Sequence, residues 1–281
     1  MRALFLIPGD AVRQLQALPA VAAVADQLSA QVQVVCAPAV APCWGLLPAV
    51  EKVIPFDFAV ANLADWANLL GSVREPDFQL CINLASGRQV DLMLSMSHIP
   101  TRIAAAGFSA TETVSPSTAG WPDQSLEAYL KPVGVSLDAA AYRLTLPRSA
   151  LDQAAAQLPA GDGPLLLLAP RGDASDWPTA QWQALPDLIR QRLPGLRSLT
   201  LPALAAANPR SRAALLAAAD VVLASDGPTV ELAVLLGLPL VALGRSQASL
   251  PARQGVQGLA VDADGLAALQ PGPVLAALGL A

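Results

Sequence analysis

The sequence has a single histidine, His98, and only three cysteines, Cys36, Cys43 and Cys81, in 281 residues. One histidine is too few for a metal site built on several imidazoles, and it leaves a single candidate for the base of a serine–histidine catalytic triad. The cysteines are odd in number, lack the spacing of metal ligands and lie in or near apolar segments. We expect small buried thiols in a reducing compartment.

Charge is scarce as well, since only 14% of the residues are charged, and long apolar runs are missing. No run reaches about 18 uninterrupted apolar residues, so a membrane-spanning helix is not expected. The first apolar run ends at Pro8 and Gly9, too early for a secretory signal, and we expect a cytoplasmic protein. A net charge of −5 argues against a domain that binds nucleic acid through its phosphates.

Hydrophobic residues are plentiful, at 54%, and their patterns alternate between strand and helix. Short apolar runs typical of buried strands recur through the first half, at residues 3–7, 32–36, 53–56, 78–83 and 102–105. Helical patterns separate them, which favours a parallel sheet with crossover helices. Residues 110–122 read as a long loop, and a second α/β series begins at Leu165. We predict an α/β fold with two Rossmann-like domains, residues 1–145 and 146–281.

The segment from Ser225 to Gly244 reads as a complete strand–helix–strand site unit. Asp226-Gly-Pro-Thr is turn chemistry that opens a helix between two apolar runs, and Gly237 closes that helix. In open α/β sheets ligands bind at the carboxyl ends of strands, where a helix N-terminus favours phosphate or another anion. If the protein binds a small ligand, Asp226 to Glu231 should line the site.

Four segments in order resemble glycosyltransferase family 9, the heptosyltransferase-like enzymes of lipopolysaccharide core synthesis. They are VEKVIPFDF at 50–58, DFQLCINLASGRQVDLMLSMSHIPTRIAAAGF at 77–108, LLLLAPRGDASDWPTAQWQAL at 165–185 and DVVLASDGPTVELAVLLGLPLVALG at 220–244. The resemblance implies a GT-B architecture, in which two Rossmann-like domains face a central cleft. It also implies inverting transfer of a sugar from a nucleotide-sugar to a glycolipid or other glycan acceptor, without a metal or other cofactor. A lipid-linked acceptor would bring the N-terminal domain to the inner membrane surface.

On the acceptor side, the resemblance points to the Gly9-Asp10 pair. Asp10 matches the family's general base, although one alignment puts Arg13 in that position instead. A carboxylate at the mouth of the first strand could take a proton from the acceptor hydroxyl, and Asp10 could equally be the N-cap of the first helix. Arg102 matches a position facing the cleft, where it could hold an acidic acceptor group or form a structural salt bridge.

On the donor side, Ser175 stands where the family has a lysine before Trp-Pro, and the family's histidine after Gly-Pro is missing. Arg171 is a candidate substitute for the lysine or an ordinary surface arginine. Glu231 could accept hydrogen bonds from ribose hydroxyls, or it is a first-turn glutamate favoured by the helix dipole. The donor-side candidates are Arg171, Gly172, Ser175, Asp226, Gly227, Pro228, Thr229 and Glu231.

One further departure weakens the match. Residues 195–219 offer one strand and one helix where the family has more, so a βα unit beside the donor pocket is missing. A non-catalytic descendant that keeps the fold as a binding or scaffolding module is therefore an alternative hypothesis. A nucleotide-sugar 2-epimerase relative is a third, resting on the Gly-x-x-x-Glu spacing that ends at Glu231. Trp177 and Trp182 favour packing over sugar stacking.

Overall fold

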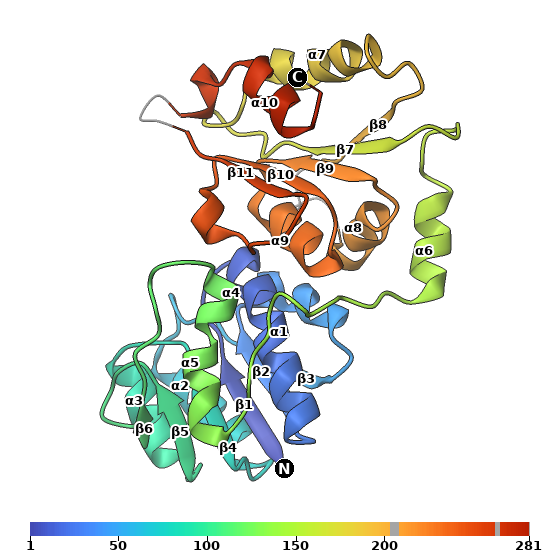
Figure 1. Cartoon of the computed structure of the whole chain (residues 1–281). Coiled ribbons are helices and arrows are strands. Elements are labelled where there is room, and N and C mark those ends of the chain that lie inside the picture. Colours follow the sequence, from blue (N-terminus) through green and yellow to red (C-terminus); the bar gives the residue numbers. More distant parts are fainter. Residues whose placement is uncertain (203–207, 262–264, 281) are drawn as a thin grey trace. The chain divides into compact units, whose positions relative to one another are not determined.

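The computed structural model describes residues 1–202, 208–261 and 265–280, and it divides into two compact units, Met1–Tyr142 and Arg143–Ala281. Each unit is a parallel sheet with helices packed on it, as Figure 1 shows. The predicted α/β class, with two successive Rossmann-like sheets, is confirmed.

The N-terminal unit has a sheet of six strands in the order β3-β2-β1-β4-β5-β6, all parallel. The strands are β1 (Arg2–Leu6), β2 (Gln31–Cys36), β3 (Val50–Pro55), β4 (Leu80–Asn83), β5 (Thr101–Ala104) and β6 (Glu112–Thr113). The chain moves outward from β1 to β3 and then crosses back to β4, so the order reverses between β1 and β4. In open sheets the crevice at such a reversal is the usual place for a ligand.

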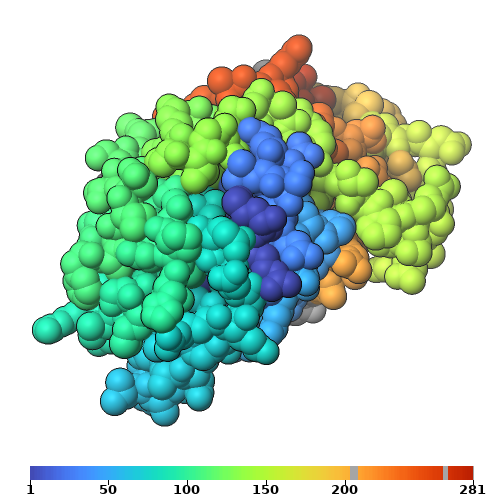
Figure 2. Space-filling view, turned by 90° about the horizontal axis from the view of Figure 1, so that it is seen from below, coloured from blue at the N-terminus to red at the C-terminus, as the bar shows by residue number. Residues whose placement is uncertain are grey.

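Helices connect these strands: α1 (Ala11–Gln27), η1 (Pro38–Leu46), α2 (Leu63–Arg74), α3 (Arg88–Met96), α4 (Pro122–Ser125), α5 (Glu127–Leu130) and η2 (Lys131–Val133). Local chemistry sets their starts. Asn62 and Asp65 form a capping box at α2, in which each side chain accepts the other residue's N–H. Figure 2 views this unit from the side where the chain begins, and the first residues lie among later segments, as expected for a central strand.

The C-terminal unit has five parallel strands in the order β11-β10-β9-β7-β8. They are β7 (Leu165–Ala169), β8 (Arg197–Thr200), β9 (Val221–Ala224), β10 (Leu240–Leu243) and β11 (Val256–Leu259). Their helices are α6 (Arg148–Ala155), α7 (Thr179–Arg190), α8 (Pro209–Leu216), α9 (Gly227–Leu236), η4 (Gln247–Ser249), η5 (Leu266–Ala268) and α10 (Pro271–Ala277). Here the strand order reverses between β7 and β9.

Three details differ from the sequence expectations. The predicted loop at 110–122 contains the two-residue strand β6, and the single helix expected after it is broken into α4, α5 and η2. The edge strand β11 was not predicted, because its sequence, VQGL, is short and only its first residue is fully buried. The region 195–219, by contrast, agrees with the expectation of one strand and one helix: its described residues hold β8 and α8, while 203–207 lie outside them.

The buried side chains agree with the thiol and tryptophan predictions. Cys36, Cys43 and Cys81 are buried and free. Trp177 and Trp182 are also buried, with their rings edge to face at 5.3 Å, so they pack rather than offer a sugar platform. Among the described residues no helix is long and apolar enough to cross a membrane.

Candidate functional site

The candidate donor site lies at the carboxyl ends of β7 and β9, where the strand order of the second sheet reverses. These strands pair directly, with Ala169 opposite Ala224. Beyond their ends, the N–H groups of Ser225 and Asp226 both donate to the Ala169 carbonyl, at 3.1 and 3.2 Å. The Arg171 N–H donates to Ser225 Oγ at 2.9 Å. The loop after β7 and the turn after β9 are therefore held together.

Asp226 begins helix α9 at this edge. Its Oδ2 accepts the N–H of Thr229 at 3.1 Å, as an N-cap should, and also the Thr229 hydroxyl. Gly227 and Pro228 form the first turn and are half-buried, while Thr229 is fully buried. The helix ends at Gly237, whose φ of +79° is a left-handed conformation that glycine adopts readily. The predicted strand–turn–helix unit is confirmed in its local structure.

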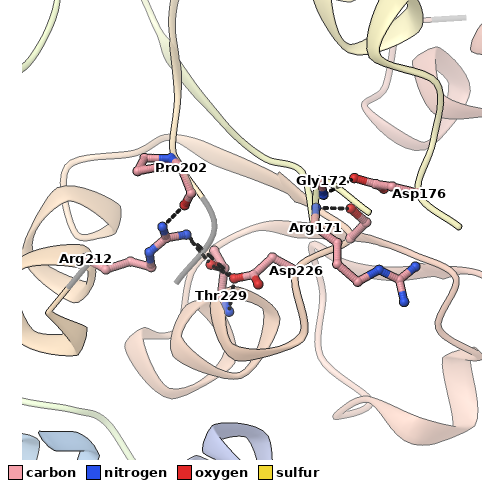
Figure 3. A network of polar contacts seen from close by, with 8 residues as sticks. Arg171, Gly172, Asp176, Pro202, Arg212, Asp226 and Thr229 are labelled. Carbon is pink, nitrogen blue, oxygen red and sulfur yellow. Dashed lines mark hydrogen bonds and ion pairs between the residues drawn. The ribbon is translucent and has the colours of Figure 1, made fainter. Parts of the chain in front are cut away.

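A buried arginine, Arg212 of α8, completes this network (Figure 3). It is 2% exposed, and its Nη1 donates to Thr229 Oγ1 at 2.7 Å and lies 3.6 Å from Asp226 Oδ2. Nη2 donates to the Pro202 carbonyl, and within the described residues Nε has no hydrogen-bond partner. Burial lowers the pKa of Arg212, and the carboxylate of Asp226 opposes that shift.

Sequence reasoning missed Arg212. The available signal was its place on a helix: Arg212 and Leu216 are four residues apart, share a face of α8 and are both buried. A charged residue on an apolar helical face needs a buried partner, and Asp226 provides it.

A second buried carboxylate, Glu231, lies further along α9. It is 1% exposed, and Arg245 Nη2 donates to its Oε1 at 3.0 Å. Arg245 follows the end of β10 and keeps about a quarter of its side chain exposed, at 24%. No acidic residue lies in the first turn of α9, so the first-turn alternative for Glu231 is wrong. An ion pair, rather than the helix dipole, holds this carboxylate.

The loop after β7 bonds mainly to itself. Arg171 Nε lies 3.3 Å from Asp173 Oδ2, and both side chains are about half exposed. The Ser175 hydroxyl and N–H donate to Asp173 Oδ1 at 2.6 and 2.8 Å, and these bonds lower the pKa of Asp173. Gly172, at a φ of +80°, donates its N–H to Asp176 Oδ2 at 2.8 Å. Figure 3 shows Arg171 and Gly172 on the opposite side of Asp226 from Arg212.

In the N-terminal unit, three predicted acceptor-side residues lie together after β1. Gly9 has a φ of +105°, and Asp10 follows it as the N-cap of α1. Asp10 Oδ1 accepts the N–H of Arg13 at 3.2 Å, and the side chains of Asp10 and Arg13 are exposed. Asp10 therefore has the predicted capping role, and its exposed carboxylate lies at the reversal between β1 and β4.

Arg102 does not join them, because its guanidinium is used within its own segment. Nε donates to the Ser109 carbonyl at 2.6 Å, and Nη1 donates to the Ile99 carbonyl. The predicted alternative of a structural salt bridge is wrong, since no carboxylate in the described part of the chain pairs with Arg102. Its backbone N–H donates to Thr111 Oγ1 at 2.8 Å, so Arg102 braces the turn after β5.

Comparison with known proteins supports the fold through structure rather than sequence. No family model and no curated protein matches the sequence. A glycosyl transferase family 9 structure from Veillonella parvula DSM 2008 matches with a TM-score of 0.80 at 13% identity, covering 99% of this chain and 96% of that one. The chain has the fold of the family 9 glycosyltransferases.

Two Escherichia coli structures with this family 9 fold also match. ADP-heptose lps heptosyltransferase II has a TM-score of 0.75 at 16% identity, covering 99% of this chain and 98% of its own. Heptosyltransferase WaaC with ADP has a TM-score of 0.72 at 14% identity, covering 99% of both chains. The same enzyme was also solved with ADP-2-deoxy-2-fluoro heptose.

Proposed function

We propose that this protein is a glycosyltransferase of the family 9 type. It transfers a heptose-like sugar, with inversion, from a nucleotide-sugar donor to a lipopolysaccharide or other glycan acceptor. The observation that supports this most strongly is the fold likeness over 99% of the chain, which includes a relative solved with ADP. We further propose that no metal takes part, and that the protein acts in the cytoplasm, at the inner membrane surface when the acceptor is lipid-linked.

In this proposal the β7–β9 edge binds the donor. The N-terminus of α9 faces the diphosphate with its partial positive charge, and Arg171 turns from Asp173 to the departing phosphate. Arg212 acts on the donor indirectly, because it holds the capping turn of Asp226 and Thr229. Glu231, whose Oε1 is ion-paired with Arg245, supports the pocket wall through that arginine.

Asp10 is the proposed general base. Its carboxylate takes the proton of the acceptor hydroxyl while the hydroxyl oxygen bonds to the anomeric carbon of the sugar. The bond from that carbon to the nucleoside diphosphate breaks at the same time, and the diphosphate leaves with the electron pair. Attack opposite the leaving group inverts the anomeric centre.

A panel of ADP, UDP and GDP, each alone and as a nucleotide-sugar, tests the donor assignment by thermal denaturation. A ligand at a hundred times its dissociation constant adds about 2.7 kcal/mol to stability. We expect one nucleotide to raise the melting temperature and Arg171→Gln to weaken its binding. Arg148→Gln is the matched control, since it makes the same charge change on an exposed helix of the same unit. No shift with any nucleotide would contradict the proposal.

One observation favours a second candidate, a non-catalytic binding or scaffolding protein with the same fold. Arg171, Arg212 and Arg245 each have a carboxylate oxygen within 4 Å, the last at 3.0 Å. A donor diphosphate would have to compete with a protein carboxylate for each of these charges. A protein that is stable and folded but is not shifted by any nucleotide would support this candidate.

A further inference from the structure

Gln14 is a polar residue buried in the first turn of α1. It is 0% exposed and belongs to none of the four family-like segments of the sequence. Buried polar side chains are expected to form hydrogen bonds. The partners of Gln14 therefore show what this residue holds in place.

Gln14 bonds to the backbone at the point where β1 leaves the sheet. Ile7 directly follows β1, and its N–H donates to the Val35 carbonyl of β2 at 3.0 Å. The Ile7 carbonyl accepts Gln14 Nε2, also at 3.0 Å, in a buried hydrogen bond. The backbone N–H of Gln14 donates to the Asp10 carbonyl at 3.2 Å. One residue therefore bonds to both ends of the turn that runs from Ile7 to Asp10.

The turn between these two ends is tight and carries an exposed carboxylate. Gly9 has a φ of +105°, and a Cβ placed on it would lie 3.0 Å from Arg13 Cγ. Gly9 and Asp10 are both exposed. An exposed turn has few packing contacts of its own, so the hydrogen bonds at its ends fix where its carboxylate lies.

A further hydrogen bond sets the orientation of the Gln14 amide. Trp44 of η1 is 2% exposed, and its Nε1 donates to Gln14 Oε1 at 3.0 Å. An indole N–H only donates and a backbone carbonyl only accepts, so both bonds form in a single orientation of the amide. Burial raises the pKa of the Cys43 thiol to about 11, and the Asp10 carboxylate raises it further, so η1 also lies near Asp10. Gln14 thus ties the turn to η1 as well as to the end of β1.

We propose that Gln14 is a positioning residue for Asp10: its amide holds the turn where the carboxylate meets the acceptor hydroxyl. The inference deepens the proposed function and rests on it. Gln14 touches no substrate and acts only through Asp10. A general base must lie within hydrogen-bond reach of the proton that it takes, so a turn that shifts or loosens lowers the rate of transfer.

Gln14→Met tests this role, because methionine is similarly long and unbranched but has neither the donor nor the acceptor of the amide. We expect transfer at saturating donor and acceptor to slow by about a hundredfold, the cost of misplacing a reacting group by an ångström. The KM of the donor should stay unchanged, because the donor edge belongs to the other unit. A rate equal to that of the unchanged protein would overturn the proposal.

Gln79→Met is the matched control, at the amino end of β1. Gln79 Oε1 accepts the Arg2 N–H at 2.7 Å, and its Nε2 donates to the Asp77 carbonyl. The control therefore also removes a glutamine amide that bonds to the backbone of the same unit, but far along the strand from Asp10. It should leave the rate unchanged. If it slows transfer as much as Gln14→Met does, Gln14 serves folding alone.

Two further variants separate positioning from a general loss of stability. Gln14→Met combined with Asp10→Asn should be no slower than Asp10→Asn alone, because the amide acts through the carboxylate. Losses that multiply in the double variant would overturn the proposal. Trp44→Phe removes only the N–H that orients the amide, and it should slow transfer in the same way but less. If Gln14→Met does not fold, an unchanged rate in Trp44→Phe would overturn the proposal in its place.

Hydrogen exchange of the segment 7–14, read by mass spectrometry, needs no substrate and so separates this inference from the proposed function. We expect faster exchange of this segment in Gln14→Met and not in Gln79→Met. Unchanged exchange in Gln14→Met would refute the anchoring of the turn, even in an active transferase. Faster exchange in a protein that transfers no sugar would support the anchoring and refute the proposed function.

Discussion

Replacing Arg212 with methionine should destabilise the C-terminal unit strongly, because the buried carboxylate of Asp226 then loses its ion-pair partner. Arg212 is 2% exposed and Asp226 is 6% exposed, with Nη1 and Oδ2 only 3.6 Å apart. Removing one partner of a buried pair costs about 3–5 kcal/mol, since the remaining charge stays buried without an opposite charge beside it, and here, among the described residues, only the Thr229 N–H and hydroxyl still bond to the Asp226 carboxylate. The Arg212→Met variant should therefore unfold at least about 10 °C below the unchanged protein.

The assay must report on the C-terminal unit alone, since two units can unfold separately. Hydrogen exchange of the β7 and β9 amides, read by mass spectrometry across a urea series, does so. Arg148→Met is the control: its ion pair with Asp152 is exposed, so its loss should change stability by less than about 0.5 kcal/mol. Combining Arg212→Met with Asp226→Asn should recover part of the loss, because neither charge then remains unpaired. A loss below about 1 kcal/mol in the single variant would refute the reasoning.

Three other outcomes follow from named contacts. Asp10→Asn should leave stability nearly unchanged, because asparagine caps helices as well as aspartate, yet slow transfer by about 10²–10⁴-fold; an unchanged rate would exclude Asp10 as the base. Gly237→Ala should destabilise more than Gly279→Ala in chemical denaturation, since both have positive φ but only the first Cβ would meet Arg143, 2.6 Å away. Burial raises the pKa of Cys36 from 9.0 to about 12, so its thiol should resist alkylation at pH 9. The thiol of the unfolded chain ionises at a lower pH than the buried thiol of Cys36. The free energy of unfolding that depends on this thiol being neutral is therefore fully present below pH 9 and falls as the pH rises towards 12.

The sequence predicted the elements whose burial follows from local pattern. The strand before Asp226 is a continuous apolar run, and the helix after it is apolar except for Thr229 and Glu231. Turn residues bound both, and the structure places β9 and α9 there. Strand β11 escaped prediction because an edge strand of four residues with one fully buried side chain carries almost no period. Strand β11 forms because its backbone pairs with β10, and its own side chains carry no pattern that would predict this.

The candidate site was predictable in its backbone and not in its charges. Turn chemistry located Asp226 at a strand end, but nothing local shows which distant arginine reaches it. Arg212 lies 14 residues before its partner Asp226, and Arg245 lies 14 residues after its partner Glu231. Each arginine reaches its carboxylate only because α8 and β10 pack beside α9. Long-range ion pairs depend on tertiary packing, which single-sequence patterns do not encode.

The three arginines of the donor edge differ in how freely they can turn to a ligand. Arg212 is buried with Asp226, and moving it away would leave the Asp226 carboxylate in the protein interior without its ion-pair partner. Arg245 is partly exposed, but its partner Glu231 is 1% exposed, so the same penalty applies to that carboxylate. Arg171 pairs with Asp173 where both side chains are about half exposed, and water can solvate either charge when the pair opens. If an anionic donor binds at this edge, Arg171 is therefore the arginine that can meet it, and its removal is the most direct test of donor binding.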